Sequence, residues 1–158
     1  MYKRQPLGIR RQDWRWNYTL GNTNREYSQI HLRPRDMLKL GILYASRGSW
    51  HGRQVLSPEW VEASLQAQSN VDDTEYGYFW WRPWIRVLAA SGEQRVRYNA
   101  AQGNGGQKIY LFPQFNLVAV ITAGAYKSKT PSNALMSTAV LPRLLDATAP
   151  NQPTDGAR

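Results

Sequence analysis

The strongest constraint on the fold comes from residues 98–123, where two apolar runs follow a glycine-rich corner. Residues 107–112 and 117–123 are rich in aliphatic, β-branched and aromatic side chains, and a Pro-Gln-Phe-Asn turn separates them. Residues 95–101 form a third run with alternating polar character. The corner at residues 103–106 carries three glycines, which permit positive φ and close approach of another segment. We therefore predict an antiparallel three-stranded meander.

Helical patterns flank this predicted meander. Residues 35–47 place apolar side chains at three- and four-residue spacings, and Gly48 follows as a stop. A second helix is expected from Ser57, because Ser-Pro-Glu is the pattern of an N-cap and first helical turn, and it should end before Asn70. Its expected inner face consists of Trp60, Val61, Ser64 and Leu65. A last helix is expected from Thr130, with a kink at Pro142 and its apolar side on the sheet. The predicted fold class is α+β, a meander with flanking helices and a C-terminal helix packed on the sheet.

The length of 158 residues suits one domain, predicted over residues 1–149, with a polar disordered tail at 150–158. Residues 1–27 are interpreted as irregular, apart from a short strand with Trp14, Trp16 and Tyr18 at alternating positions. The aromatic run at 76–81 is interpreted as a heavily buried strand rather than a stacking surface for sugars or bases.

A net charge of +9 raises the question of an anionic partner. Residues 1–53 hold eleven Lys and Arg against three acids, but the basic residues are scattered and form no nucleic-acid motif. Solvated charged faces are therefore the favoured interpretation. The adjacent acids Asp72 and Asp73 are likewise interpreted as solvated loop residues rather than a cation site.

The chain has no cysteine and only two histidines, so thiolate chemistry is excluded and a protein-built zinc site is disfavoured. No metal and no cofactor is predicted. The first residues lack the apolar run of a secretion signal, and no stretch reaches the roughly eighteen apolar residues of a membrane helix. We expect no membrane span and assign no localisation.

Four motifs occur in an ordered series, at residues 32–41, 48–61, 76–81 and 103–112. They read Leu-x-Pro-Arg-Asp-Met-x-Lys-Leu-Gly, Gly-x-Trp-x-Gly-x-Gln-Val-Leu-Ser-Pro-Glu-Trp-Val, Tyr-Gly-Tyr-x-Trp-Trp, and Gly-x-Gly-Gly-Gln followed by Tyr-Leu-Phe at 110–112 and Pro113. In this order they resemble the C-terminal part of the serine β-lactamase-like hydrolases, the family of class C β-lactamases, D-Ala-D-Ala peptidases, lactamase-fold esterases and 6-aminohexanoate-dimer hydrolase. The similarity runs from about Leu7 to Leu145.

The resemblance implies an enzyme that attacks ester, amide or β-lactam acyl groups with the serine of a Ser-x-x-Lys motif, assisted by a Tyr-x-Asn motif. Neither motif is present in this chain, so no catalytic residue is assigned and the chain alone is expected to be inactive. By spacing, the family's Lys-Thr-Gly motif falls at Tyr98-Asn99-Ala100, without the cation that would hold a substrate carboxylate. The backbone N–H of Ala101 is the implied oxyanion donor. The implied substrate-binding residues are Tyr98, Asn99, Ala100, Ala101, Gly103 and Asn104.

In the family fold the final strand pairs with a strand from the N-terminal region. Residues 117–123 would therefore keep an unpaired apolar edge, and we expect either a homodimer through this strand or a complex with a missing N-terminal part. The alternative is a stand-alone binding module that uses its basic, aromatic N-terminal region, including Arg10, Arg11 and Arg15, to bind nucleic acid or an acidic protein.

Overall fold

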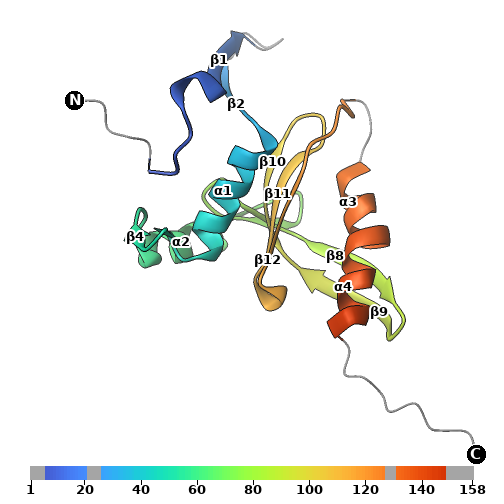
Figure 1. Cartoon of the computed structure of the whole chain (residues 1–158). Coiled ribbons are helices and arrows are strands. Elements are labelled where there is room, and N and C mark those ends of the chain that lie inside the picture. Colours follow the sequence, from blue (N-terminus) through green and yellow to red (C-terminus); the bar gives the residue numbers. More distant parts are fainter. Residues whose placement is uncertain (1–5, 21–25, 127–130, 149–158) are drawn as a thin grey trace, which may run out of the picture.

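A computed structural model describes residues 6–20, 26–126 and 131–148 and has an α+β fold (Figure 1). Its main sheet is antiparallel, with the strand order β12-β11-β10-β7-β6-β5. The strands are β5 (Ser69–Val71), β6 (Thr74–Tyr76), β7 (Trp81–Arg82), β10 (Asn99–Gly103), β11 (Gln107–Phe112) and β12 (Leu117–Ile121). The predicted α+β class and the antiparallel order of the last three strands are confirmed.

Strand β11 lies inside the sheet and is buried on both faces. Tyr110 and Phe112 face one hydrophobic core, whereas Ile109 and Leu111 face another. A strand of this kind reads as a continuous apolar run in the sequence. Both faces of the sheet must therefore be covered by other elements.

Helix α1 (Pro34–Ala45) covers the face of Ile109 and Leu111. The helix approaches the sheet at Gly41, where an added Cβ would lie 2.5 Å from Val118 Cγ1 and 2.9 Å from Ile109 Cγ2. Larger side chains at this position would push the helix away. The helix ends as predicted, with Gly48 at a φ of +82° shortly after its last turn.

The C-terminal helices cover the opposite face. They are α3 (Pro131–Leu135), a π-helical turn η3 (Met136–Val140) and α4 (Leu141–Thr148). The expected kink takes the form of this widened turn, in which the Leu141 N–H donates to Met136 O immediately before Pro142. Pro142 has no N–H to donate, so the normal helical ladder is interrupted here. The residues from 149 onward, including the predicted tail, lie outside the described residues.

Strands β8 (Trp84–Ala89) and β9 (Gly92–Arg97) form a hairpin. This hairpin continues the main sheet beyond a break in the hydrogen-bond ladder. The register is continuous across the break, because Trp84 lies opposite Arg97 and Ala100 lies opposite Trp81. Tyr98 donates its N–H to Pro83 O at 3.3 Å, but Pro83 has no N–H to return. The expectation of one strand over residues 95–101 was therefore wrong, since the ladder breaks at Tyr98.

The aromatic run at residues 76–81 is not a continuous buried strand, and that prediction was wrong. Tyr76 ends β6, Trp81 begins β7, and the residues between them form a connection closed by a 2.8 Å hydrogen bond from Gly77 N to Trp80 O. Within it Trp80 is buried but Phe79 is 83% exposed with a φ of +66°. A hydrophobic pattern cannot distinguish such a turn from a strand.

Helix α2 (Pro58–Leu65) begins as predicted, with Ser57 Oγ accepting from the Trp60 N–H at 3.1 Å. Trp60 was expected on its inner face, but it is 47% exposed and stacks on Tyr78.

The remaining elements are the short 3-10 turns η1 (Arg11–Asp13) and η2 (Pro113–Phe115) and two hairpins. One hairpin joins β1 (Trp14–Leu20) to β2 (Glu26–Leu32), and the other joins β3 (Ser49–Trp50) to β4 (Arg53–Gln54). The N-terminal region is thus more regular than predicted.

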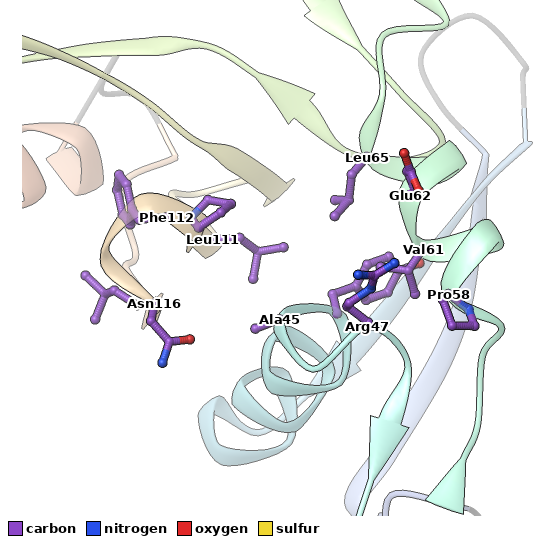
Figure 2. Close-up of a pocket in the computed structure, with 12 residues that line it drawn as sticks. Ala45, Arg47, Pro58, Val61, Glu62, Leu65, Leu111, Phe112 and Asn116 are labelled. Atoms are coloured by element: carbon purple, nitrogen blue, oxygen red, sulfur yellow. The ribbon is translucent and has the colours of Figure 1, made fainter.

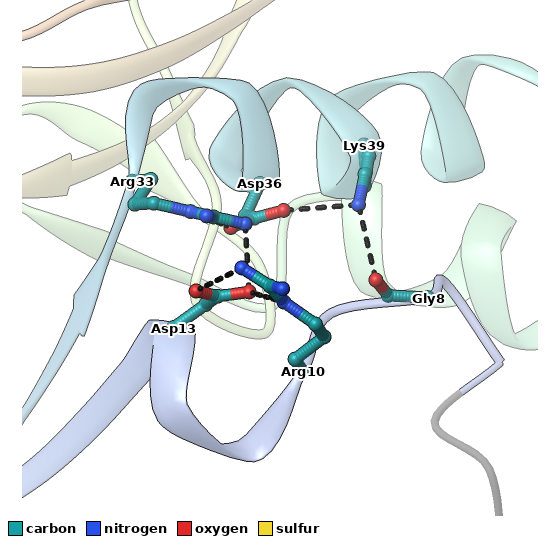
Figure 3. A network of polar contacts seen from close by, with 6 residues as sticks. All are labelled: Gly8, Arg10, Asp13, Arg33, Asp36 and Lys39. Carbon is teal, nitrogen blue, oxygen red and sulfur yellow. Dashed lines mark hydrogen bonds and ion pairs between the residues drawn. The ribbon is translucent and has the colours of Figure 1, made fainter.

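Charged side chains tie the N-terminal segment to the first turn of α1 (Figure 3). Asp36 is buried and receives Arg33 Nε at 2.8 Å and Lys39 Nζ at 3.0 Å. Arg33 also reaches Asp13 at 3.0 Å, and Asp13 accepts Arg10 Nε at 2.7 Å. Two carboxylates therefore share three cations.

The same network holds the acids ionised. Hydrogen bonding from Arg33 outweighs burial and lowers the pKa of Asp36 below its ordinary value. Hydrogen bonding from Arg10 lowers the pKa of Asp13 in the same direction. Lys39 also donates to Gly8 O at 3.4 Å, which links helix α1 to the chain before η1.

We predict that Asp36→Asn lowers the free energy of unfolding by roughly 1–3 kcal/mol at neutral pH, because the buried position loses the carboxylate charge that Arg33 and Lys39 bind. A lowered folded-state pKa stabilises the protein above the unfolded-state pKa, and this contribution disappears as the pH falls through the folded-state value. Urea unfolding should therefore show the two proteins converging in acid. Asp72→Asn, at an exposed turn, is the control and should change little; equal stability of D36N and wild type at neutral pH would refute the assignment.

Candidate functional site

The six residues predicted to bind substrate lie at the break before β10, on β10 and in the turn after it, but they do not share one surface. Tyr98 and Ala100 are buried in the core beneath the C-terminal helices. Asn99 and Ala101 belong to the other face, where Asn99 Nδ2 donates to Leu65 O at 3.1 Å. Their alternation follows from the twofold period of a strand.

The other two predicted residues, Gly103 and Asn104, are exposed where β10 turns into β11. The turn closes on Gly105 and Gly106, whose φ values are +83° and +88°. An added Cβ at Gly105 would lie 2.7 Å from Tyr126 Cε1. The expected close approach of another segment to this corner is therefore present, and its partner is the chain following β12.

The direction of the Ala101 N–H follows from the ladder. Successive N–H groups of an antiparallel strand point to opposite sides. Since the Tyr98 N–H points to Pro83, the Ala101 N–H points the other way, toward its partner Ile109 on β11. Gln102, one residue later, directs its N–H away from β11. On this geometry the backbone N–H of Gln102 is better placed than that of Ala101 to donate to a ligand.

A buried polar cluster lies behind β10 and was not anticipated as a site. Asn133 Oδ1 accepts from Lys108 Nζ at 2.8 Å, from Tyr110 Oη at 3.1 Å and from Tyr98 Oη at 3.3 Å. Ser132 is also buried, and its hydrogen bond to Tyr110 only partly offsets the rise that burial causes in the pKa of Tyr110. Lys108 is visible in the sequence as the one charge in an apolar run, but Asn133 lies 25 residues away and carries no local signal.

Burial controls the titration of this cluster. Desolvation lowers the pKa of Lys108 and raises the pKa of Tyr98 and of Tyr110. Among the described residues, no carboxylate lies within ion-pair distance of Lys108. Ser132 is only 3% exposed, which keeps it from meeting an acyl substrate as a nucleophile.

A pocket of about 400 Å³ opens on the side of the sheet that α1 covers (Figure 2). It lies between the end of α1, helix α2 and the turn from β11 to β12, and its lining is mainly apolar, with Arg47 and Glu62 as charged members. The six predicted substrate-binding residues do not line it. The pocket and the predicted site are therefore separate places on the molecule.

The two histidines do not form a metal site. His31 Nε2 lies 3.1 Å from Asn17 Nδ2, and the His51 ring packs edge-on against Trp50. Within residues 6–20, 26–126 and 131–148, no three His, Cys, Asp or Glu side chains gather as metal ligands. In the same part of the chain no helix has the length and apolar character of a membrane span.

Fold and site together define an α+β domain whose antiparallel sheet carries helices on both faces, with the candidate residues on β10 and its turn. Comparison with models of protein families found no match, and neither did comparison with curated proteins. Any assignment of function therefore depends on the residues themselves.

We predict that Lys108→Met raises the free energy of unfolding by about 1 kcal/mol at neutral pH, because it removes a desolvated cation without a carboxylate partner. A lowered lysine pKa penalises the folded state at low pH, and the penalty is relieved as the pH rises toward the ordinary lysine range. The stability difference between K108M and wild type should therefore shrink with rising pH, as measured by chemical unfolding. A K108M protein that is less stable at every pH would contradict this account.

Proposed function

We propose that this chain is the C-terminal portion of a β-lactamase-like serine hydrolase. The observation that carries the proposal is the meander β10-β11-β12, with α1 on one face and the C-terminal helix on the other, in the order that the four sequence motifs imply. The implied reaction is acyl transfer from an ester, amide or β-lactam to water. Fold alone does not define chemistry, so the motif series provides the functional part of the argument.

In this proposal β10 and its turn form one wall of the substrate site. Asn99, Gly103 and Asn104 contribute polar groups and backbone, while Tyr98 and Ala100 support the strand from behind. Ala101 was the implied oxyanion donor, but the alternation of the ladder favours the N–H of Gln102 for that task. The nucleophile and its lysine would come from elsewhere, because no serine of this sequence has lysine three positions on.

We predict that the purified chain hydrolyses neither nitrocefin nor p-nitrophenyl esters above the buffer rate. Positioning groups and oxyanion donors without a nucleophile retain only a small part of an enzyme's rate. A serine-directed phosphonate should leave no covalent adduct on the intact mass. Hydrolysis that the phosphonate abolishes would overturn the claim that the nucleophile is missing.

Strand β12 offers a route to completion by another chain. Among the described residues it pairs with β11 alone, which leaves it at the edge of the sheet. Residues 113–126 carry no charge, so this edge lacks the charged side chains that commonly block strand pairing. The Ala101 N–H points to its partner Ile109, so the Ile109 N–H points to β10 and the Tyr110 N–H points to its partner Ala119 on β12. By the same alternation the N–H groups of Val118 and Val120 point outward.

We propose that this edge binds either a second copy or the missing N-terminal part, and predict that the isolated chain dimerises at micromolar concentration. Val120→Pro removes one outward N–H and should shift sedimentation toward the monomer, whereas Val120→Thr retains it and should still associate. Circular dichroism would check that both variants are folded. A monodisperse wild-type monomer would exclude the homodimer.

A further inference from the structure

The β8–β9 hairpin has one buried side and one side open to solvent. Its inner residues Ile85, Val87 and Val96 pack into the core with the C-terminal helices, which lie beside the hairpin in Figure 1. We call the other side the outer hairpin face, and it consists of Trp84, Arg86 and Leu88 on β8 with Glu93, Arg95 and Arg97 on β9. This surface carries three arginines and one exposed indole.

Two of these arginines are placed against each other. Arg86 and Arg95 are direct cross-strand partners, an arrangement in which like charges are destabilising. Glu93 reaches Arg86 only at 3.6 Å, and both side chains are largely exposed. Among the described residues Arg95 forms no ion pair with a carboxylate. The centre of the face therefore concentrates positive charge.

Trp84 extends this charged surface with an aromatic one. The guanidinium carbons of Arg95 and Arg97 lie 5.1 and 5.2 Å from its ring centroid, within cation–π range. Trp84 is nevertheless 49% exposed. Arg97 also binds Glu75, which Arg82 contacts at 2.8 Å, so one acid is shared by two cations. Indole and guanidinium groups thus form one continuous contact surface.

We propose that the outer hairpin face binds single-stranded nucleic acid, with Arg86 and Arg95 holding phosphates and Trp84 stacking on a base. Arginine forks match phosphate oxygens, and aromatic side chains in a basic groove are the common means of holding unpaired strands. A duplex keeps its bases inside, so it could use the arginines but not the indole. An anionic membrane is disfavoured because Glu93 faces the exposed Leu88 near the hairpin tip.

The N-terminal region, which the sequence suggested for the same task, is less suitable. Arg10 and Arg33 are bound to Asp13 and Asp36, so much of the local charge is already neutralised. On the outer hairpin face, by contrast, three arginines are accompanied by one acid, Glu93, and the hydrolase proposal does not use this hairpin. The two proposals are therefore independent.

The test is the binding of a fluorescein-labelled oligothymidine strand to the full chain, followed by anisotropy across a range of sodium chloride concentrations. Trp84→Leu should weaken binding about tenfold, the usual scale for loss of one stacked base. The double variant R86Q/R95Q should reduce the salt dependence, the slope of log K against log salt, by about 1.4, or roughly 0.7 for each phosphate that is no longer neutralised. Melting temperatures would check that each variant is folded.

The matched control is R35Q/R53Q, which removes two exposed arginines and the same net charge from other elements. It should change the slope far less than the hairpin variant. The proposal is overturned if both double variants weaken binding equally, if the wild type does not bind the strand, or if it binds a duplex, an acidic peptide or phosphatidylserine vesicles more tightly than the single strand.

Discussion

The structure depends on the burial of β11 on both of its faces. One face carries Tyr110 and Phe112, and the other carries Ile109 and Leu111; all four side chains are removed from water in the folded chain. Burying an apolar side chain fully contributes roughly 1.5–3 kcal/mol to the free energy of unfolding. Both helical layers follow from this requirement. The absence of a side chain at Gly41 lets α1 approach the sheet, and the ions around Asp36 hold the first turn of that helix to the N-terminal segment.

A single proline decides how the remaining strands are used. Because Pro83 cannot return the hydrogen bond from Tyr98, the ladder is interrupted between a part that belongs to the main sheet and a part that forms the β8–β9 hairpin. The part in the main sheet, β10, carries the residues proposed to form one wall of a hydrolase substrate site. The second part covers the C-terminal helices with its inner side and leaves an arginine-rich outer side open to solvent.

The candidate site shows where sequence reasoning reaches its limit. The glycines at 103–106 predicted a close approach, and Gly105 does pack against Tyr126. The sequence could not indicate that Tyr98 and Asn99 face opposite layers with different tasks, because that depends on which face each helix covers. Nor could it indicate that Lys108 and Asn133 meet, since two residues 25 positions apart share no local pattern.

The sequence by itself determined the elements whose cause is local: the apolar strands β11 and β12, the Ser-Pro-Glu start of α2, the glycine stop after α1 and the helix that Pro142 disturbs. Their residue types restrict the backbone without help from distant partners. Tertiary structure alone decided that residues 77–80 form a turn, that residues 95–101 are divided at Tyr98, and that Arg86 lies opposite Arg95. These outcomes depend on pairing between separate strands, and pairing is set by register and burial that no single segment contains.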